Sequence, residues 1–300
     1  MKKTNFTTCG IAVLVSVFVM FVTGCGQTAN SVNNEKEFDS AIGKYTRAIQ
    51  LNPDDSEAYK NRGWIYFEKG EYDRAMDDYN KAIHLKSDYA EAYNNRGMVY
   101  RNKGDYDRAI VDYDNAIKFK PDYAAAYNNR GVAHKRKMDY ERAFNDIDKA
   151  IQLKPDYAMA YCNRGNIYND KGNYDRAIIA YDKAIQLEPD YTMVYYNRGT
   201  VYRNKGDYDR AINDFDKAIQ LKPDYAEAYA GRGGTYILKG NNDSAIKDHD
   251  KAIQLKPDYA EAYLGRSMVY RLKGDNERAA KDIDKAIQLK PSLKQVIDSP

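Results

Sequence analysis

The sequence predicts an all-α solenoid of antiparallel helix pairs, and two features support this fold class. Seven of the eight prolines fall on a strict 34-residue spacing, and Ser87 occupies the one vacant place between Pro53 and Pro121. Between these places, apolar and small residues recur every three or four positions in two runs of about 14 residues, the pattern of two amphipathic helices. We therefore expect one continuous array of stacked pairs rather than the two globular domains that 300 residues would suggest.

The composition excludes several other classes of protein. With 43% hydrophobic residues, 30% charged residues and a mean hydropathy of −0.80, the chain is not a polytopic membrane protein, a collagen or a disordered chain. Its 47 basic and 44 acidic residues give a net charge of +3, so nothing favours nucleic-acid binding. The 29 tyrosines are another sign of a repeated pattern.

The segment 1–24 resembles a lipoprotein signal peptide. Lys2 and Lys3 precede an apolar stretch over residues 11–22, which at about 1.5 Å per residue is too short to cross a membrane core of about 30 Å. The sequence VTGC at residues 22–25 is similar to a lipobox, in which the cysteine takes a diacylglycerol before cleavage. This resemblance implies that Cys25 is the lipidated first residue of an extracytoplasmic chain. Gly26 carries no aspartate retention signal, which favours the outer membrane, facing the periplasm, if the cell has two membranes. The alternative is an uncleaved anchor or an ordinary secretory signal.

The repeats are bounded by short terminal segments. Residues 25–35 comprise the lipidated cysteine and a polar stretch that we expect to be a flexible tether. Residues 36–55 form a half repeat, residues 56–293 form seven full repeats, and residues 294–300 form a short tail. Because the tail is too short for the usual solvating helix, we expect a short or frayed segment there, and a partner or a second copy on the last apolar face.

Turn residues separate the predicted helices. Within most repeats a glycine, able to adopt a left-handed conformation, ends the first helix, and the Asp, Glu or Asn that follows can cap the second. Met138 replaces this glycine in the third repeat, so its turn should be strained or differently shaped. Between repeats, Pro-Asp-Tyr ends the second helix, and capping boxes are predicted for the next one, as for Asp88 with Glu91.

These residues resemble the tetratricopeptide repeat family over about residues 36–293. Each repeat has an aromatic residue at its fourth place, most have glycine at the eighth, and all have two alanines on the second helix, as in Tyr93, Gly97, Ala109 and Ala116. The resemblance implies a right-handed superhelix of seven full repeats and an N-terminal half repeat, with the first helix of each pair lining the concave side.

A charged pair recurs within this framework. An arginine stands at the seventh place of every repeat, and an aspartate recurs on the second helix, which predicts a partly buried ion pair in each repeat. Arg74 and its equivalents could compete for that aspartate. Ala180 replaces the aspartate in the fourth repeat, so Arg164 should be held differently from its counterparts.

No catalytic or cofactor-binding constellation is present in the sequence. It contains no HExxH motif, nucleophile elbow, phosphate-binding glycine loop or paired-cysteine motif, so we expect neither an enzyme nor a bound metal or cofactor. His134 and His249 replace framework aromatics and are predicted to be packed core residues. Cys162 is predicted to be a small surface residue rather than a reactive thiol.

Asparagine occupies the sixth place of five consecutive repeats, at Asn61, Asn95, Asn129, Asn163 and Asn197. A side-chain amide offers both a donor and an acceptor, so a regular column of them can pair with the main chain of an extended peptide. The column is similar to the asparagine ladder of peptide-binding superhelices in this family. The alternative is that these asparagines bond locally.

The other groove-lining positions vary from repeat to repeat, as expected of a surface matched to a partner. We assign to this groove Trp64, Phe67, Arg101, Arg136, Tyr196, Arg203, Leu238, Met268 and Leu272. Tyr196 is the one tyrosine outside the places that tyrosine occupies in the repeat, and Ile237 and Leu264 are expected to join an exposed aliphatic cluster at the C-terminal end. The alternative is that these residues vary from repeat to repeat only through sequence drift on an exposed face.

The sequence thus predicts a non-enzymatic, lipid-anchored scaffold whose concave groove binds an extended peptide or a partner helix. The two-carboxylate clamp of chaperone-tail binders in this family is incomplete, because Trp64, Ala125 and Asn129 stand where Asn, Lys and Arg would be needed. The alternative function is a self-associating structural envelope protein that uses the C-terminal end. The expected partners are a protein or peptide and a lipid bilayer, with no nucleic acid.

Overall fold

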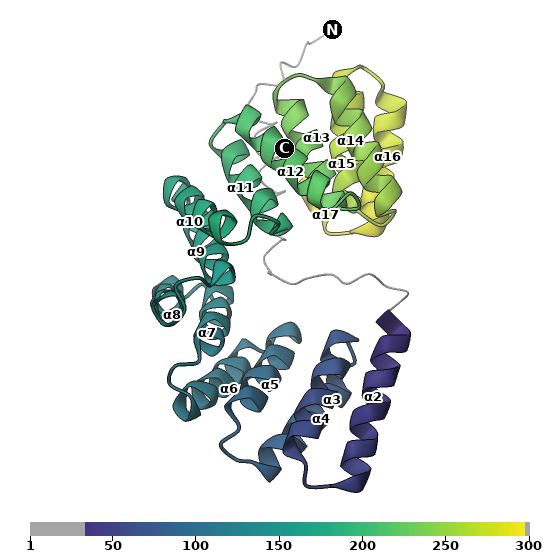
Figure 1. Ribbon diagram of the computed structural model, residues 1–300. Coiled ribbons are helices and arrows are strands. Elements are labelled where there is room, and N and C mark those ends of the chain that lie inside the picture. The colour runs from purple at the N-terminus through teal and green to yellow at the C-terminus, as the bar shows by residue number, and fades with distance from the viewer. Residues whose placement is uncertain (1–33, 298–300) are drawn as a thin grey trace. The chain divides into compact units, whose positions relative to one another are not determined.

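The computed structural model describes residues 34–297, and within this range every regular element is a helix (Figure 1). The helices are α2 (Asn34–Leu51), α3 (Ser56–Glu68), α4 (Tyr72–Leu85), α5 (Ala90–Asn102), α6 (Tyr106–Phe119), α7 (Ala124–Arg136), α8 (Tyr140–Leu153), α9 (Ala158–Asp170), α10 (Tyr174–Leu187), α11 (Thr192–Asn204), α12 (Tyr208–Leu221), α13 (Ala226–Leu238), α14 (Asn242–Leu255), α15 (Ala260–Leu272), α16 (Asn276–Leu289) and α17 (Leu293–Ile297). The prediction of an all-α solenoid of tandem helix pairs is confirmed.

The described residues form two compact units, residues 34–171 and residues 172–297. The boundary lies in the turn of the fourth repeat, whereas the sequence predicts one uninterrupted array. Within each unit, every helix packs against the next along the chain. The first helices of neighbouring repeats also touch, as α5 does α7 in one unit and α13 does α15 in the other. This contact is expected where first helices line the inner side of a curved stack.

The turns within the repeats follow the sequence prediction. Six glycines adopt positive φ angles between the paired helices, from 71° at Gly172 to 81° at Gly104 and Gly206. Met138 is the one non-glycine residue with positive φ in the described chain, at 62°, and its side chain is 74% exposed. A left-handed conformation costs a non-glycine residue about 1–2 kcal/mol, so the predicted strain at this turn is confirmed.

The helix caps are only partly as predicted. In most repeats an Asp or Asn side chain caps the second helix, as Asp105 does by accepting from the Arg108 backbone nitrogen at 3.0 Å. The predicted capping boxes of the first helices are wrong, because the N-cap residue is a tyrosine without a side-chain cap bond, such as Tyr89. Glu91 accepts instead from Lys120, the residue that follows α6, at 2.9 Å.

The residue at the eighth place of the repeat is small because a side chain of the second helix packs directly against it. A Cβ atom built on Gly97 would lie 2.7 Å from the Tyr113 ring, and the same kind of approach recurs along both units. The paired alanines of the second helices, such as Ala109 and Ala116, are fully buried at the helix crossing. Small residues at these places let the two helices of a pair approach closely.

Helices α2 and α17 end the described part of the chain. Helix α2 supplies the predicted half repeat but begins at Asn34, two residues earlier than expected. At the other end, Leu293 of α17 is buried against Ala260, Leu264 and Ala286. The predicted signal peptide, Cys25 and most of the tether lie outside the described residues. No helix within residues 34–297 combines the length and the apolar character needed to cross a membrane.

Candidate functional site

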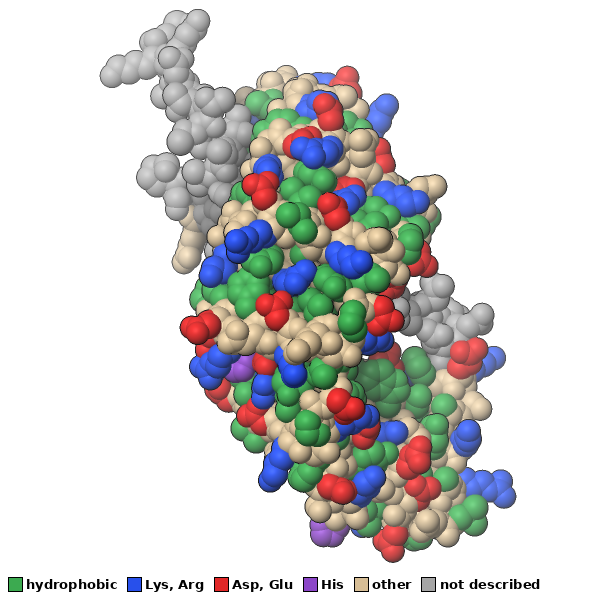
Figure 2. All heavy atoms as spheres, turned by 60° about the vertical axis from the view of Figure 1, so that its left-hand side comes forward, with side chains coloured by type: hydrophobic (Ala, Val, Ile, Leu, Met, Phe, Trp, Pro, Cys, Tyr) green, Lys and Arg blue, Asp and Glu red, His purple; other side chains and the backbone are tan. Residues whose placement is uncertain are grey.

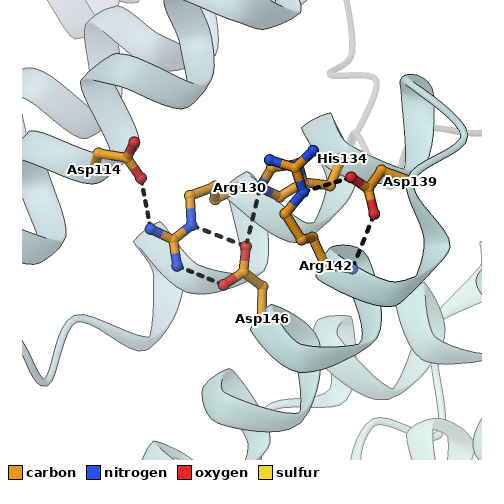
Figure 3. A network of polar contacts seen from close by, with 6 residues as sticks. All are labelled: Asp114, Arg130, His134, Asp139, Arg142 and Asp146. Carbon is orange, nitrogen blue, oxygen red and sulfur yellow. Dashed lines mark hydrogen bonds and ion pairs between the residues drawn. The ribbon is translucent and has the colours of Figure 1, made fainter.

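The recurring arginine joins three helices rather than two, as Figure 3 shows for Arg130 of α7. Its Nε and Nη2 donate to the two carboxylate oxygens of Asp146 in its own repeat, at 2.9 and 2.6 Å. Its Nη1 donates to Asp114 on the second helix of the preceding repeat, at 2.5 Å. Arg130 therefore fastens its own helix pair and also the preceding repeat, and its two bonds to Asp146 have the bidentate geometry that suits a guanidinium.

The predicted ion pair is confirmed in six of the seven repeats, at Arg62, Arg96, Arg130, Arg198, Arg232 and Arg266. Arg164 is the exception. Its Nη1 lies 3.5 Å from Asp148, and its buried Nε has no partner among the described residues. The suggested competitor does not compete, because Arg74 pairs with Glu71 instead.

The second acceptor of this arginine was missed at the sequence level. Asp112 and Asp114 are two residues apart on α6, and the same Asp-x-Asp spacing recurs on other second helices. One carboxylate is buried beneath the arginine of its own repeat, and the other reaches the arginine of the next. The recurrence of two aspartates at this spacing is the signal that could have revealed the link.

Exposed charged side chains also form ion pairs between neighbouring repeats. Lysines that end the first helices pair with an aspartate 30 residues earlier, as Lys103 does with Asp73 at 2.6 Å. On the face drawn in Figure 2, basic and acidic side chains are interspersed, with no block of one sign. Mixed charge of this kind is typical of a solvated helical face rather than of a nucleic-acid site.

The asparagine column lies along the first helices, and its middle members already make hydrogen bonds within the protein. The Nδ2 atoms of Asn129 and Asn163 donate to Oδ1 of Asn94 and Asn128, each at 2.9 Å and each in the preceding repeat. Arg101 also donates to Asn129, at 3.3 Å. Each amide nitrogen keeps a second N–H for another acceptor. Replacing these asparagines would therefore change repeat packing as well as any peptide contact.

The outer members of the column differ in exposure. Asn61 and Asn95 are half-buried, whereas Asn197 is buried in α11. The column is thus most accessible near the N-terminal end of the first unit.

The aromatic groove residues form two clusters, one in each unit. Trp64 and Phe67 stack with ring centroids 5.4 Å apart on α3, and both are half-buried. Tyr196 on α11 packs against Phe215 and Tyr225, at centroid distances of 5.7 and 5.3 Å. Each cluster presents a partly exposed aromatic face.

The basic groove residues differ in their surroundings. Arg136 is exposed at the end of α7, and Arg101 is half-buried on α5. Lys135 is buried, and its ammonium group pairs with Asp170 at 3.0 Å. Burial lowers the pKa of Lys135, and the Asp170 carboxylate partly offsets this effect. Arg203 is buried without such a partner.

The aliphatic cluster predicted at the C-terminal end is smaller than expected. Ile237 and Leu264 are buried in the core and do not face solvent, so that part of the prediction is wrong. Leu238 and Met268 are half-buried, and Leu272 is 52% exposed. Sequence periodicity places all five on the first helices but cannot tell which of them the next helix covers.

Cys162 and two of the three histidines lie in the core. His134 and His249 are buried, as predicted, and the two ring nitrogens of His249 have no partner among the described residues. Cys162 is fully buried, which corrects its assignment to the surface. Across residues 34–297, no group of three or more His, Cys, Asp and Glu side chains could hold a metal ion.

Sequence patterns of the tetratricopeptide repeat match most of the chain. The matches cover residues 44–77, 63–103, 97–137, 124–157, 158–191, 193–225 and 239–293. The chain belongs to the tetratricopeptide repeat family. Members of this family are generally non-enzymatic scaffolds that bind protein or peptide partners. A search of curated proteins finds no match.

Solved structures share the fold at low sequence identity. A tetratricopeptide repeat protein from Parabacteroides merdae is 22% identical, with a TM-score of 0.63 over 80% of this chain and 96% of that one. The structure described as pilF of Pseudomonas aeruginosa is 21% identical, with a TM-score of 0.60 over 67% and 92%. A chain of the APC/C hetero-tetramer Cut9-Hcn1 is 17% identical, with a TM-score of 0.70 over 78% of this chain. This chain spans 46% of that longer protein, so the likeness shows the repeat fold alone.

Proposed function

We propose that this tetratricopeptide repeat protein is a membrane-anchored scaffold outside the cytoplasm, and that its first-helix surface binds an extended peptide or a partner helix. The observation that carries the proposal is the contrast between a repeated framework and a variable first-helix surface. Arginine, glycine and alanine hold the same packing places from repeat to repeat, while the half-buried ninth place changes from Trp64 to Met98, Val132, Thr200 and Met268. Packing does not require this variation, whereas a matched partner does.

The accessible groups on this surface suit a peptide. The stacked Trp64 and Phe67 offer an aromatic platform, and aromatic side chains are common anchors at interfaces. The half-buried Asn61 offers an amide group that can bond to a main chain, whereas the Oδ1 of half-buried Asn95 already accepts from Asn94 at 3.3 Å.

Self-association through the C-terminal end is the weaker alternative. Leu293 covers apolar residues of α15 and α16, and Ile237 and Leu264 are already buried. Less apolar surface is therefore left at this end than the sequence predicts.

Peptide binding can be tested with the purified protein. The purified protein, immobilised, should retain peptides from a mixed-sequence library. Trp64→Ala should reduce this retention about tenfold because it removes an aromatic anchor. Val111→Ala is the matched control, since Val111 is exposed on the second helix α6. Equal loss in both variants, or no retention by the wild-type chain, would contradict the proposal.

The membrane anchor has an independent test. In cells fed labelled palmitate, the wild-type protein should carry label and lose the segment 1–24, because the thiol of Cys25 is the proposed acceptor. Cys25→Ser should abolish both labelling and processing, while Cys9→Ser should affect neither. Label that persists in Cys25→Ser would refute lipid attachment at this residue.

A further inference from the structure

Arg203 on α11 is a buried cation without a partner. It is only 6% exposed, and no described side chain or backbone group accepts a hydrogen bond from its guanidinium. Its Nε is fully enclosed without a partner, while the two terminal nitrogens keep some access to solvent. Burial lowers the pKa of Arg203, partly offset by Tyr196 and Tyr259. A charge removed from water in this way destabilises the folded protein unless an acceptor compensates it.

Basic residues at the same repeat place in the other unit have acceptors. Arg101 donates to Asn129, which lies 28 residues further along the chain, at 3.3 Å. Lys135 pairs with Asp170, the residue 35 positions further along, at 3.0 Å.

Both acceptors are missing for Arg203. The residue 28 positions further along is Gly231, and the residue 35 positions further along is Leu238. The chain therefore keeps the cation at this place but carries neither of the side chains that satisfy it elsewhere.

The surroundings of Arg203 leave room for an acceptor from outside. A Cβ atom built on Gly234 would lie 3.6 Å from Nη1 of Arg203, and no other atom beyond its chain neighbours and its own helix backbone would lie within 4 Å. The two carboxylates that act on the adjacent Tyr196 already have partners, because Glu227 pairs with Lys256 at 3.1 Å and Glu261 with Lys290 at 2.6 Å.

We propose that Arg203 forms a carboxylate-binding subsite of the first-helix surface, in which a partner's carboxylate accepts two parallel hydrogen bonds from the guanidinium. This inference rests on the proposed peptide-binding function and adds the chemistry of one partner group. A bidentate carboxylate matches the planar guanidinium and supplies the missing negative charge.

The charge balance favours a monoanion over a phosphate. Arg203 is a single cation, and Glu227 and Glu261 lie near enough to act on the adjacent Tyr196. A phosphate dianion would have only the charge of Arg203 to neutralise it, because Lys256 and Lys290 already pair with these two carboxylates. The carboxylate can come from an Asp or Glu side chain or from the C-terminus of the partner peptide.

The test compares three mixed-sequence peptide libraries on the immobilised protein. One library has a free C-terminus and no acidic residue, the second has Asp and Glu with an amidated C-terminus, and the third has neither. The wild-type protein should retain one or both carboxylate libraries at least tenfold better than the third, and the better of the two identifies the source. Arg203→Met should lose this preference.

A second pair of variants keeps Arg203 in place. Leu238→Asp puts a carboxylate at the place that Asp170 holds relative to Lys135. This carboxylate should pair with Arg203 and remove the preference for the carboxylate libraries. Leu238→Asn is the matched neutral control and should preserve it. In the absence of peptide, Arg203→Met and Leu238→Asp should each raise the melting temperature, because each removes the unpaired buried charge.

The outcomes separate this inference from the proposed function. Equal retention of all three libraries by the wild-type protein would overturn the carboxylate subsite and leave peptide binding intact. Retention of none would overturn both. A preference that survives in Arg203→Met, or an Arg203→Met protein that melts no higher than the wild type, would also refute the subsite.

Discussion

Asp112→Ala is expected to lower the free energy of unfolding by about 3 kcal/mol, because it leaves a largely buried guanidinium without its main partner. The Arg96 Nε and Nη2 atoms donate to both Asp112 oxygens, at 2.8 and 2.7 Å, and the Asp112 side chain is 3% exposed. These hydrogen bonds raise the pKa of Arg96, which keeps its charge. Only the bond from Arg96 to Asn80, at 2.8 Å, would remain. Urea unfolding followed by circular dichroism measures the loss.

Asp114→Ala provides the matched control on the same helix. Asp114 also binds an arginine, Arg130, but its side chain is 54% exposed, so the change should cost less than about 1 kcal/mol. Replacing both Arg96 and Asp112 by apolar residues should recover part of the stability lost in Asp112→Ala. Equal effects of the two single aspartate variants would show that burial does not set the strength of these pairs.

His249→Phe is expected to stabilise the protein, most strongly in acid. His249 is fully buried on α14, and neither of its ring nitrogens has a partner, an arrangement that costs about 1–3 kcal/mol. Phenylalanine already fills the equivalent place in the preceding repeat, where Phe215 packs between Gly199 and Gly231. The change should therefore remove unsatisfied polar atoms without altering the packing pattern.

The acid effect follows from the pKa of His249, which burial, with a smaller contribution from Arg266, lowers from 6.5 to about 3. Below pH 6.5 the unfolded chain takes up a proton that the folded protein does not bind until about pH 3, so stability falls as the pH falls across this window. The upper limit of this loss is about 4–5 kcal/mol. Melting temperatures measured from pH 7 to pH 4 should diverge between wild type and His249→Phe, while exposed His84→Gln should follow the wild type. Parallel curves for wild type and His249→Phe would contradict this account.

The repeat framework could be predicted because local backbone and packing geometry requires a particular residue type at each of its places. The helix-ending glycines need a left-handed conformation, and the paired alanines need a close helix approach; both requirements recur with the period of the repeat. The arginine–aspartate pair was predictable for the same reason, and the absence of the aspartate at Ala180 correctly marked Arg164 as different.

The contacts between repeats were harder to predict. The period does not show which outer aspartate reaches the next arginine, so Asp114 was missed. The prediction of capping boxes was wrong because Tyr89 is the N-cap residue and Glu91 pairs with Lys120, which lies in the next turn between repeats. Burial of Cys162 and Ile237 depends on how neighbouring helices cover them, which a single repeat's pattern does not encode.

The candidate surface was predicted as a set of positions but not as a set of interactions. The sequence places Asn129 and Arg203 on the same helical face as their counterparts in other repeats. It does not show that Asn129 bonds to Asn94 of the preceding repeat, or that Arg203 lacks an acceptor. Those differences arise from side chains in adjacent repeats, and they separate a residue engaged in packing from one available to a partner.

Site-specific photocrosslinking in intact cells tests the central claim most directly. Crosslinking residues placed at Trp64 on α3 and Leu272 on α15 would probe the first-helix surface, and those at Val111 on α6 and Ile179 on α10 would probe exposed second-helix positions. The first-helix positions should form adducts with a common partner, and the second-helix positions should not. Adducts formed equally from both surfaces, or only from Val111 and Ile179, would contradict a scaffold that binds its partner through the first helices.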